Sequence, residues 1–225
     1  MIHIILVPQG AEYQAVCRGI GRATTPVVVP IPVGAAPLGR YLKTWQQREA
    51  LRGGQTFLVM GLCGGLTPNH TIGDIVLYRE CIDRAEAHTR LPCDAALTER
   101  LQSAFVQEAT LVRALTSDRL VWSAQEKHQL AHQYHADVVD MEGFAALKSL
   151  AQTGATVAML RVVSDNAQHN LPRLTNAIDA HGSLQPLPLA WGMVRQPIAA
   201  ARLIRGSLKG LKTLQAVTRR LVNEV

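Results

Sequence analysis

Carboxylate, hydroxyl and glycine residues follow four apolar stretches of the chain, at the point where each stretch gives way to polar sequence. Glu12 follows the first stretch within VPQGAE, and a Gly-Gly pair follows the third within LCGGL. Asp140 and Glu142 follow ADVV within DMEG, whereas Ser164 and Asp165 end AMLRVVSD. Carboxylates can exchange protons with a substrate, and glycines let the backbone approach one closely. These residue types indicate acid–base chemistry on a small molecule.

The apolar stretches that precede these residues are predicted strands. Most are β-branched and nearly continuous, as expected for strands buried on both faces, and they cover residues 2–7, 26–33, 56–62, 74–81, 109–116, 136–141 and 156–164. Helical patterns separate them at Leu38–Leu51, Ala95–Gln107, Ala124–His135 and Gly143–Gln152. The alternation predicts an α/β fold with a mixed or mostly parallel sheet and helices on both faces. Because ligands bind at the carboxyl ends of such strands, the polar residues are expected to share one cleft.

Length and composition restrict the class of protein. The 225 residues are enough for one sizeable domain, expected to span residues 1–225, and an apolar content of 48% supplies a full core. The formal net charge is +6, but aromatic residues make up only 4%, which is thin for a surface that stacks nucleic-acid bases. We therefore expect a small-molecule substrate and no nucleic acid.

The four cysteines predict neither a metal site nor a redox motif. Cys17, Cys63, Cys81 and Cys93 include no pair with C-x-x-C spacing. Met1 leads directly into a predicted strand rather than a signal peptide, and prolines interrupt the longest apolar stretch. These features favour a reduced, cytoplasmic protein without a bound metal.

Residues 197–222 predict a basic amphipathic helix. Its apolar residues recur every three or four positions and are Ala200, Ile204, Leu208, Leu211, Leu214, Val217 and Leu221. Its basic flank consists of Arg202, Arg205, Lys209, Lys212 and Arg219. Such a helix could pack on the core, pack in a dimer, or lie on the inner face of an anionic membrane as a peripheral contact. The pair Gly206 and Gly210 favours close helix packing.

Three histidines lie on one predicted helix. His128, His132 and His135 have helical spacing, and a histidine pair four residues apart can bind zinc. The segment EKHQLAHQYH has no acidic partner at the required place and is polar all round. We therefore interpret it as a solvated helix face.

Four motifs, in this order, resemble the superfamily of purine nucleoside phosphorylases and 5′-methylthioadenosine/S-adenosylhomocysteine nucleosidases. They are LCGGL, IGDIVL, DMEG and RVVSDNA, of which the last two are the specific ones. The segment from Leu171 to Pro197, followed by the basic helix, is similar to the hopanoid-associated phosphorylases of that superfamily, which cleave adenine from adenosylhopane. The resemblance implies a three-layer α/β/α sandwich, no cofactor, and a homo-oligomer.

The resemblance also assigns roles to individual residues. Asp165 matches the acid that protonates the leaving purine, and Ser164 could orient it. This acid must hold a proton near neutral pH, which burial at the end of an apolar strand favours. Glu142 matches the acceptor of the ribose hydroxyls, with Met141 on the apolar side of the sugar. Glu12 matches the glutamate that positions attacking water.

Asp140 has a separate expected role. Its place before Gly143 favours capping of the following helix, where an anion suits the positive end of the helix dipole. Ser164 and Asp165 could likewise only form a turn, Met141 could only pack in the core, and Glu12 could be an exposed acid.

The sequence departs from the family where phosphate binds. Val59 and Leu62 stand where phosphorylases commonly carry an arginine and a serine. The peptide N–H groups of Cys63, Gly64 and Gly65 could still bind inorganic phosphate as a co-substrate. Arg18 and Arg22 are further candidates. The absence of the arginine and the serine at positions 59 and 62 favours water as the nucleophile, whereas the similarity to phosphorylases favours phosphate.

The expected base pocket also departs from the family. Leu120 and Val121 stand where nucleosidases carry an aromatic–aliphatic pair against adenine, and Trp122 follows them. Loss of the ring removes a stacking contact that Trp122 could replace.

The residues and the resemblance together predict cleavage of the N-ribosidic bond of an adenine nucleoside substituted at its 5′ carbon, such as an adenosylhopane-like lipid. Two alternatives stay open. One is hydrolysis of methylthioadenosine or adenosylhomocysteine. The other is a nucleoside-binding module that has lost catalysis.

Overall fold

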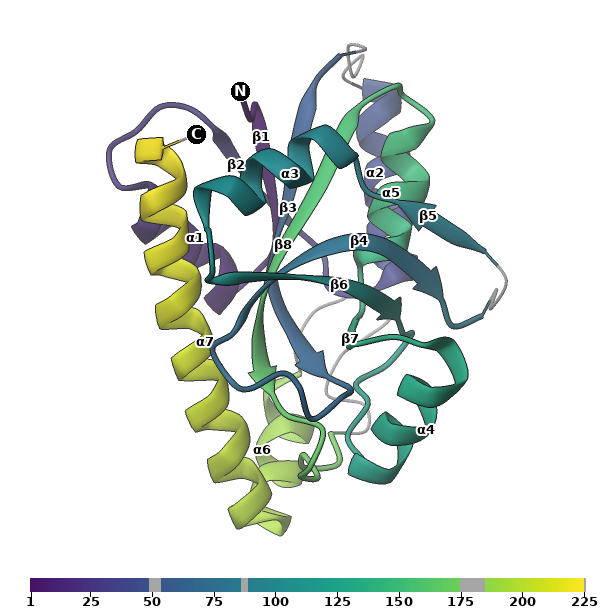
Figure 1. Ribbon diagram of the computed structural model, residues 1–225. Coiled ribbons are helices and arrows are strands. Elements are labelled where there is room, and N and C mark those ends of the chain that lie inside the picture. Colours follow the sequence, from purple (N-terminus) through teal and green to yellow (C-terminus); the bar gives the residue numbers. More distant parts are fainter. Residues whose placement is uncertain (49–53, 86–88, 175–184, 225) are drawn as a thin grey trace.

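Eight strands pair into one sheet in the computed structural model, which describes residues 1–48, 54–85, 89–174 and 185–224 (Figure 1). The strands are β1 (Ile4–Pro8), β2 (Val27–Ile31), β3 (Thr56–Gly65), β4 (Ile75–Asp83), β5 (Arg90–Pro92), β6 (Ala109–Thr116), β7 (Val138–Asp140) and β8 (Thr156–Asp165). The helices are α1 (Ala11–Ile20), α2 (Ala35–Arg48), α3 (Ala95–Ala104), α4 (Ala124–Tyr134), α5 (Gly143–Ala151), α6 (Pro186–Arg195) and α7 (Pro197–Glu224).

The sheet is mixed and mostly parallel, which confirms the predicted fold class. The pairs β1–β2, β1–β3, β3–β8, β4–β6 and β6–β7 are parallel, and β3–β7, β4–β5 and β4–β8 are antiparallel. Because β8 pairs with both β3 and β4, five strands close a ring in the order β3, β8, β4, β6 and β7. This ring brings the ends of β3, β7 and β8 together, and these ends carry the glycine and carboxylate motifs.

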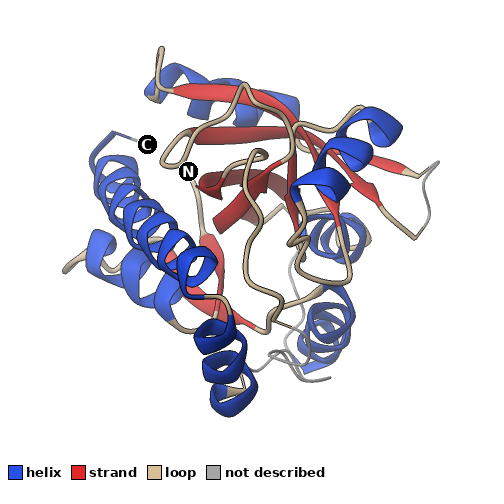
Figure 2. Cartoon of the chain, turned by 90° about the horizontal axis from the view of Figure 1, so that it is seen from below, coloured by secondary structure: helices blue, strands red, loops and turns tan. Residues whose placement is uncertain are grey.

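Helices cover both faces of the sheet, so the structure has the three layers that the resemblance implies. One apolar cluster joins the sheet to α2 and α5, and another joins its opposite face to α1, α3 and α7. Figures 1 and 2 show these helices on the two sides of the central strands. A third, smaller cluster holds α4 against the ends of β4, β6 and β7. The motif-bearing strand ends therefore lie next to α4, α5 and α7.

The apolar stripe of α7 mainly packs on the core. Ala200, Leu214, Val217 and Leu221 are buried, and the last three belong to the cluster that includes α1. Ile204 and Leu208 stay 46% and 55% exposed. Core packing, one of the three interpretations of this helix, therefore accounts for its C-terminal half.

Two glycines let α7 lie directly on the end of β8. A Cβ at Gly206 would stand 2.1 Å from the carbonyl oxygen of Ser164, and one at Gly210 would stand 2.9 Å from Leu62. The close helix packing predicted from the Gly-x-x-x-Gly spacing is present, and its partner is a strand end. α7 thus borders the segment that contains Ser164 and Asp165.

Three elements have no counterpart in the sequence-based prediction. They are α1, which begins after Gly10, the Pro-rich helix α6, and the short strand β5. The other helices begin and end within a few residues of the expected limits, although positions 49–51 of the expected Leu38–Leu51 helix lie outside the described residues. Residues 175–184, part of the segment similar to hopanoid-associated enzymes, lie outside them as well. Among the described residues, no helix is long and apolar enough to cross a membrane.

Candidate functional site

A small cavity joins five of the residues expected to form the site. Its volume is about 40 Å³, and its lining includes Gly64, Leu120, Val121, Met141 and Asp165. The lining comes from the ends of β3, β7 and β8 and from the segment after β6, which the closed ring of strands brings together. The cavity is smaller than the roughly 300 Å³ of typical ligand sites, so binding a purine here requires these side chains to move apart.

Asp165 lies at the edge of this cavity, and both of its carboxylate oxygens accept hydrogen bonds. Oδ1 accepts one from the Ser164 hydroxyl at 3.1 Å, and Oδ2 accepts one from Nζ of Lys127. The Ser164 hydroxyl also lies 3.2 Å from the Cys63 carbonyl. A Cβ on Gly64 would stand only 3.0 Å from Oδ2, so the glycine leaves the room that this carboxylate occupies. The carboxylate is therefore held at a defined place beside β3.

Lys127 is a partner of Asp165 that sequence reasoning missed. Its side chain is completely buried, and its Nζ also donates to the Asn166 carbonyl at 2.8 Å. The interpretation of the segment EKHQLAHQYH as a solvated helix face is confirmed for its histidines but is wrong for Lys127 and Leu130, which α4 packs inward. A lysine is almost never fully buried unless it is paired, and the pair with Asp165 meets that condition.

A second charged group forms around Arg161, which sequence analysis gave no role. Its guanidinium is completely buried, with NH2 3.3 Å from Oδ2 of Asp140 and 3.6 Å from Oε2 of Glu142. Nε, NH1 and NH2 nevertheless have no hydrogen-bond partner among the described residues. Burial lowers the pKa of Arg161, but Asp140 and the other acids around it raise it above its ordinary value. The structure thus holds a charged, partly unsatisfied donor inside the protein.

Glu12 turns its carboxylate toward this arginine. Its Oε2 accepts the Leu62 N–H at 2.7 Å, and a Cβ on Gly61 would stand 2.4 Å from both this oxygen and NH1 of Arg161. Burial raises the pKa of Glu12 to about 7, while Arg161 opposes the shift and Glu142 adds to it. A carboxylate with this pKa can accept a proton near neutral pH, which is the property of a general base.

Glu142 belongs to the Arg161 group rather than to the helix that follows it. It occupies the position before α5 but makes no capping hydrogen bond, and its Oε1 instead accepts the Gly34 N–H at 2.9 Å. Burial raises the pKa of Glu142, and Arg161 opposes this shift. Gly34, which has a φ of 95°, brings the turn before α2 to the site and was not expected there. Its hypothetical Cβ would lie 4.0 Å from Met141.

Asp140 fixes the start of α5, as expected. Its two oxygens lie 3.2 and 3.1 Å from the Gly143 N–H, and Oδ1 also accepts from the Thr116 hydroxyl at 2.8 Å. The same Thr116 oxygen accepts the Phe144 N–H at 2.8 Å. Asp140 also contacts Arg161 and lines the small cavity, so it joins the two parts of the site.

The segment Cys63–Gly65 lies inside β3 rather than in a free loop. Gly64 and Gly65 pair with β7, and Cys63 and Gly64 pair with β8 across a register shift. Their peptide groups therefore belong to a sheet that has neighbours on both sides. Burial raises the pKa of the Cys63 thiol far above its ordinary value, so this thiol stays protonated.

Several other candidate residues lie elsewhere. Arg18 is exposed and contacts Gln215 of α7, and Arg22 is exposed. Trp122 packs under Arg173, whose guanidinium is 4.2 Å from the ring centre, and does not line the small cavity. His128 and His132 of α4, and His135 directly after it, are exposed. No group of three or more potential metal ligands occurs within the described part of the chain.

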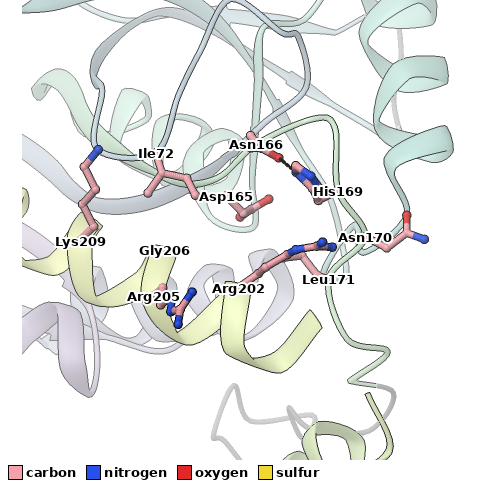
Figure 3. Close-up of a pocket in the computed structure, with 10 residues that line it drawn as sticks. All are labelled: Ile72, Asp165, Asn166, His169, Asn170, Leu171, Arg202, Arg205, Gly206 and Lys209. Carbon is pink, nitrogen blue, oxygen red and sulfur yellow. Dashed lines mark hydrogen bonds between the residues drawn. The ribbon is translucent and has the colours of Figure 1, made fainter. Parts of the chain in front are cut away.

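A larger cavity lies next to Asp165, between the segment after β8 and α7. Its volume is about 350 Å³, and Figure 3 shows its lining. The lining residues are Ile72, Asp165, Asn166, His169, Asn170, Leu171, Arg202, Arg205, Gly206 and Lys209. Asp165 is the one residue that lines both cavities.

Comparisons with known proteins agree with this arrangement. Residues 17–184 match the Phosphorylase superfamily. The match covers more than half of the chain and includes Glu142, Arg161 and Asp165, so the chain belongs to this superfamily. No curated protein matches the chain in sequence.

Solved nucleosidases share the fold. The chain is similar to the 5′-methylthioadenosine/S-adenosylhomocysteine nucleosidase of Helicobacter pylori, with a TM-score of 0.72, 14% identity, and coverage of 99% of this chain and 97% of that one. The futalosine hydrolase of the same organism gives the same four values. A putative nucleosidase of this kind from Francisella philomiragia has a TM-score of 0.70 and 14% identity, with 99% and 98% coverage. These likenesses show that the chain has the same fold.

Proposed function

We propose that the protein cleaves the N-ribosidic bond of a purine nucleoside and uses water as the nucleophile. One observation carries this proposal. The carboxyl group of Asp165 lines the small cavity beside Leu120 and Met141. The segment from Asp140 to Glu142 joins this cavity to a buried group that contains a second carboxylate, Glu12, whose pKa is raised. An acid for the leaving base and a base for the nucleophile are the two catalysts that this reaction requires.

Asp165 is the proposed acid for the leaving purine. Breaking the C1′–N9 bond places an electron pair on the base, which leaves more easily when N7 receives a proton. Leu120, Val121 and Met141 are apolar neighbours suited to the faces of a purine ring. Ser164 holds this carboxylate in place, and the ammonium of Lys127, which is hydrogen-bonded to Oδ2, supplies the proton that Asp165 passes to N7.

Glu142 is the proposed acceptor for the ribose hydroxyls. Its Oε1 already accepts the Gly34 N–H, and Oε2 faces Arg161 at 3.6 Å. A carboxylate has about four acceptor sites, so both oxygens can accept further hydrogen bonds. As the sugar gains positive charge in the transition state, a nearby carboxylate stabilises it.

The charges around Arg161 favour water over phosphate. Three carboxylates, Glu12, Asp140 and Glu142, surround one guanidinium, so the group has an excess of negative charge when all three are ionised. A phosphate dianion would add to that excess, whereas a neutral water molecule would not. Water can also use the unsatisfied Arg161 N–H groups as donors and give a proton to Glu12.

The substrate proposed for this site is an adenine nucleoside substituted at its 5′ carbon. The proposal that this substrate is an adenosylhopane-like lipid depends only on the similarity of the C-terminal part of the chain to hopanoid-associated enzymes. Methylthioadenosine and adenosylhomocysteine are the substrates in the name of a structural neighbour that shares 14% identity. A panel of adenosine, these two compounds, futalosine and a long-chain 5′-alkyl adenosine distinguishes these classes.

The direct test measures base release from this panel. Wild-type protein is expected to release the base from at least one member without phosphate. Asp165→Asn is expected to lower that rate by about 10²–10⁴-fold, the usual contribution of a general acid. Asp118→Asn, at an exposed carboxylate in the segment after β6, is the matched control. Binding of a nucleoside without base release, from any member of the panel, would instead identify a binding module.

Two partner interactions stay predictions. Leu187, Trp191, Val194 and Ile198 on α6 and the start of α7 are between 60% and 83% exposed. This apolar surface, with Arg195 stacked on Trp191 at 4.7 Å, supports contact with an anionic membrane surface. Flotation with anionic and neutral liposomes tests that contact, and sedimentation tests the expected homo-oligomer.

A further inference from the structure

The cavity of about 350 Å³ beside Asp165 has a positively charged wall. Arg202, Arg205 and Lys209 of α7 are among its lining residues, and Figure 3 shows their side chains leaving the helix in different directions. None of the three forms an ion pair with a carboxylate among the described residues. Three like charges around one hollow are unfavourable without a counter-charge, so this wall suits an anion.

The carboxylate in the lining does not neutralise this wall. Asp165 is the one acid among the lining residues, and the buried ammonium of Lys127 already pairs with it. The cavity thus keeps the charge of the two arginines and the lysine. His169 and the amides of Asn166 and Asn170 complete its polar lining, with His169 Nδ1 3.0 Å from Oδ1 of Asn166.

Glycines bring the basic residues close to the active segment. Because Gly206 lacks a side chain, α7 lies against the Ser164 carbonyl. Arg202 and Arg205, which flank this contact on α7, line the cavity together with Asp165 and Asn166. A Cβ on Gly73 would stand 2.8 Å from Cε of Lys209, so Gly73 leaves room for that lysine stem. The arrangement of the cations therefore depends on two specific close approaches.

We propose that this cavity binds a small phosphate-bearing anion and that its occupation promotes base release. Arginine guanidinium groups bind phosphate oxygens in pairs, and lysine adds a point charge. The volume suits inorganic phosphate or a small phosphate monoester. The binding part stands on the cavity alone, and the effect on rate rests on the proposed function.

This site would make phosphate an activator rather than a reactant. An anion in this cavity offsets part of the positive charge beside Asp165, through which the proton passes to the base. The nucleophile group around Arg161 is negatively charged and does not share lining residues with this cavity. Phosphate is therefore expected to accelerate the reaction without being consumed.

Binding is tested by calorimetry with inorganic phosphate and with glycerol 3-phosphate, against chloride at equal ionic strength. The wild-type protein is expected to give saturable binding of one or both. Arg202→Gln/Arg205→Gln should weaken it by more than about tenfold, because each charge-assisted hydrogen bond contributes on that order. Lys212→Gln/Arg219→Gln, which removes two exposed charges of α7 outside the cavity, should bind as the wild type does. Equal binding by both double variants, or none by the wild type, would overturn the inference.

The effect on rate is tested with a nucleoside from which base release has been established. Phosphate should raise the rate roughly two- to fivefold, the range for a solvent-screened charge interaction, with free sugar as the product. The Arg202→Gln/Arg205→Gln variant should lose this stimulation. Formation of a sugar 1-phosphate, or equal stimulation in this variant, contradicts activation through the cavity. The protein could bind phosphate through Arg202 and Arg205 and yet release no base from any nucleoside. That result would overturn the proposed function but would support the proposed anion-binding site.

Discussion

The two charged parts of the site combine the same residue types in opposite proportions. Around Arg161, three carboxylates surround one buried cation. At Asp165, one carboxylate pairs with one buried lysine, and three further cations line the adjacent cavity. The first part is suited to a neutral nucleophile and a cationic sugar, and the second to a leaving base and an anion. The difference separates the place where water attacks from the place where phosphate can bind.

Removing the proposed base tests the Arg161 side and should have the largest effect. Glu12→Gln keeps the size and an oxygen for the Leu62 N–H but cannot accept a proton from water. The rate of base release is expected to fall about 10²–10⁴-fold. Since the pKa of Glu12 is raised to about 7, the wild-type rate should also fall as the pH decreases through that value. A wild-type rate that is independent of pH between 6 and 8, or full activity in the variant, would rule out this base.

Asp140 and Glu142 allow a sharper comparison within the Arg161 side. Asp140→Ala removes a buried ion-pair partner and the contact with Gly143, so the free energy of unfolding should fall by about 3–5 kcal/mol. Glu142→Gln keeps its shape and should lower turnover far more than stability. Denaturant unfolding and base-release rates measure both variants. The reverse pattern would mean that the roles of the two acids were exchanged.

A double-mutant cycle tests the Asp165 side. Lys127→Met is expected to destabilise the protein by about 3 kcal/mol, because it leaves the Asp165 carboxylate without its buried partner. In the double variant with Asp165→Asn the loss should be smaller than the sum of the single losses. Additive losses in denaturant unfolding would show that the two side chains do not interact.

The pH dependence of the free energy of unfolding is expected to give the smallest effect. The pKa of Glu12 is raised on folding from 4.5 to about 7, so the folded state binds a proton more tightly than the unfolded state. This contribution to stability is fully present below pH 4.5 and is lost as the pH rises through 7. The Glu12→Gln variant has no charge to desolvate. Its free energy of unfolding should therefore exceed that of the wild type by about 1–3 kcal/mol at pH 8 and equal it near pH 4. A gain that is equal at both pH values would contradict the raised pKa.

The sequence predicted the strands other than β5, most helices and the contact of Asp140 with the start of α5. Those features depend on local pattern, since an apolar strand followed by DMEG indicates both the strand end and the start of a helix. The closed ring of strands was not predictable, because it depends on β8 pairing with two strands that are distant in the chain. Gly-flanked α1 and Pro-rich α6 lacked clear helix signals.

Two buried cations show where sequence reasoning was weakest. Arg161 stands inside the apolar strand VAMLRVVS, and a charge at a place that should be buried was a signal that could have been used. Lys127 gave no comparable signal, because it is one of many polar residues in α4 and its burial depends on how that helix docks. Charged residues within predicted buried strands therefore identify site residues more readily than those on helices.

The origin of the oxygen on the released sugar tests the central claim most directly. The reaction is run with a responsive nucleoside in ¹⁸O-labelled water that contains phosphate, and the sugar is analysed by mass spectrometry. Attack by water guided by Glu12 and Arg161 predicts one labelled oxygen at C1 of a free sugar. A sugar 1-phosphate, whose C1 oxygen comes from unlabelled phosphate, would contradict the account.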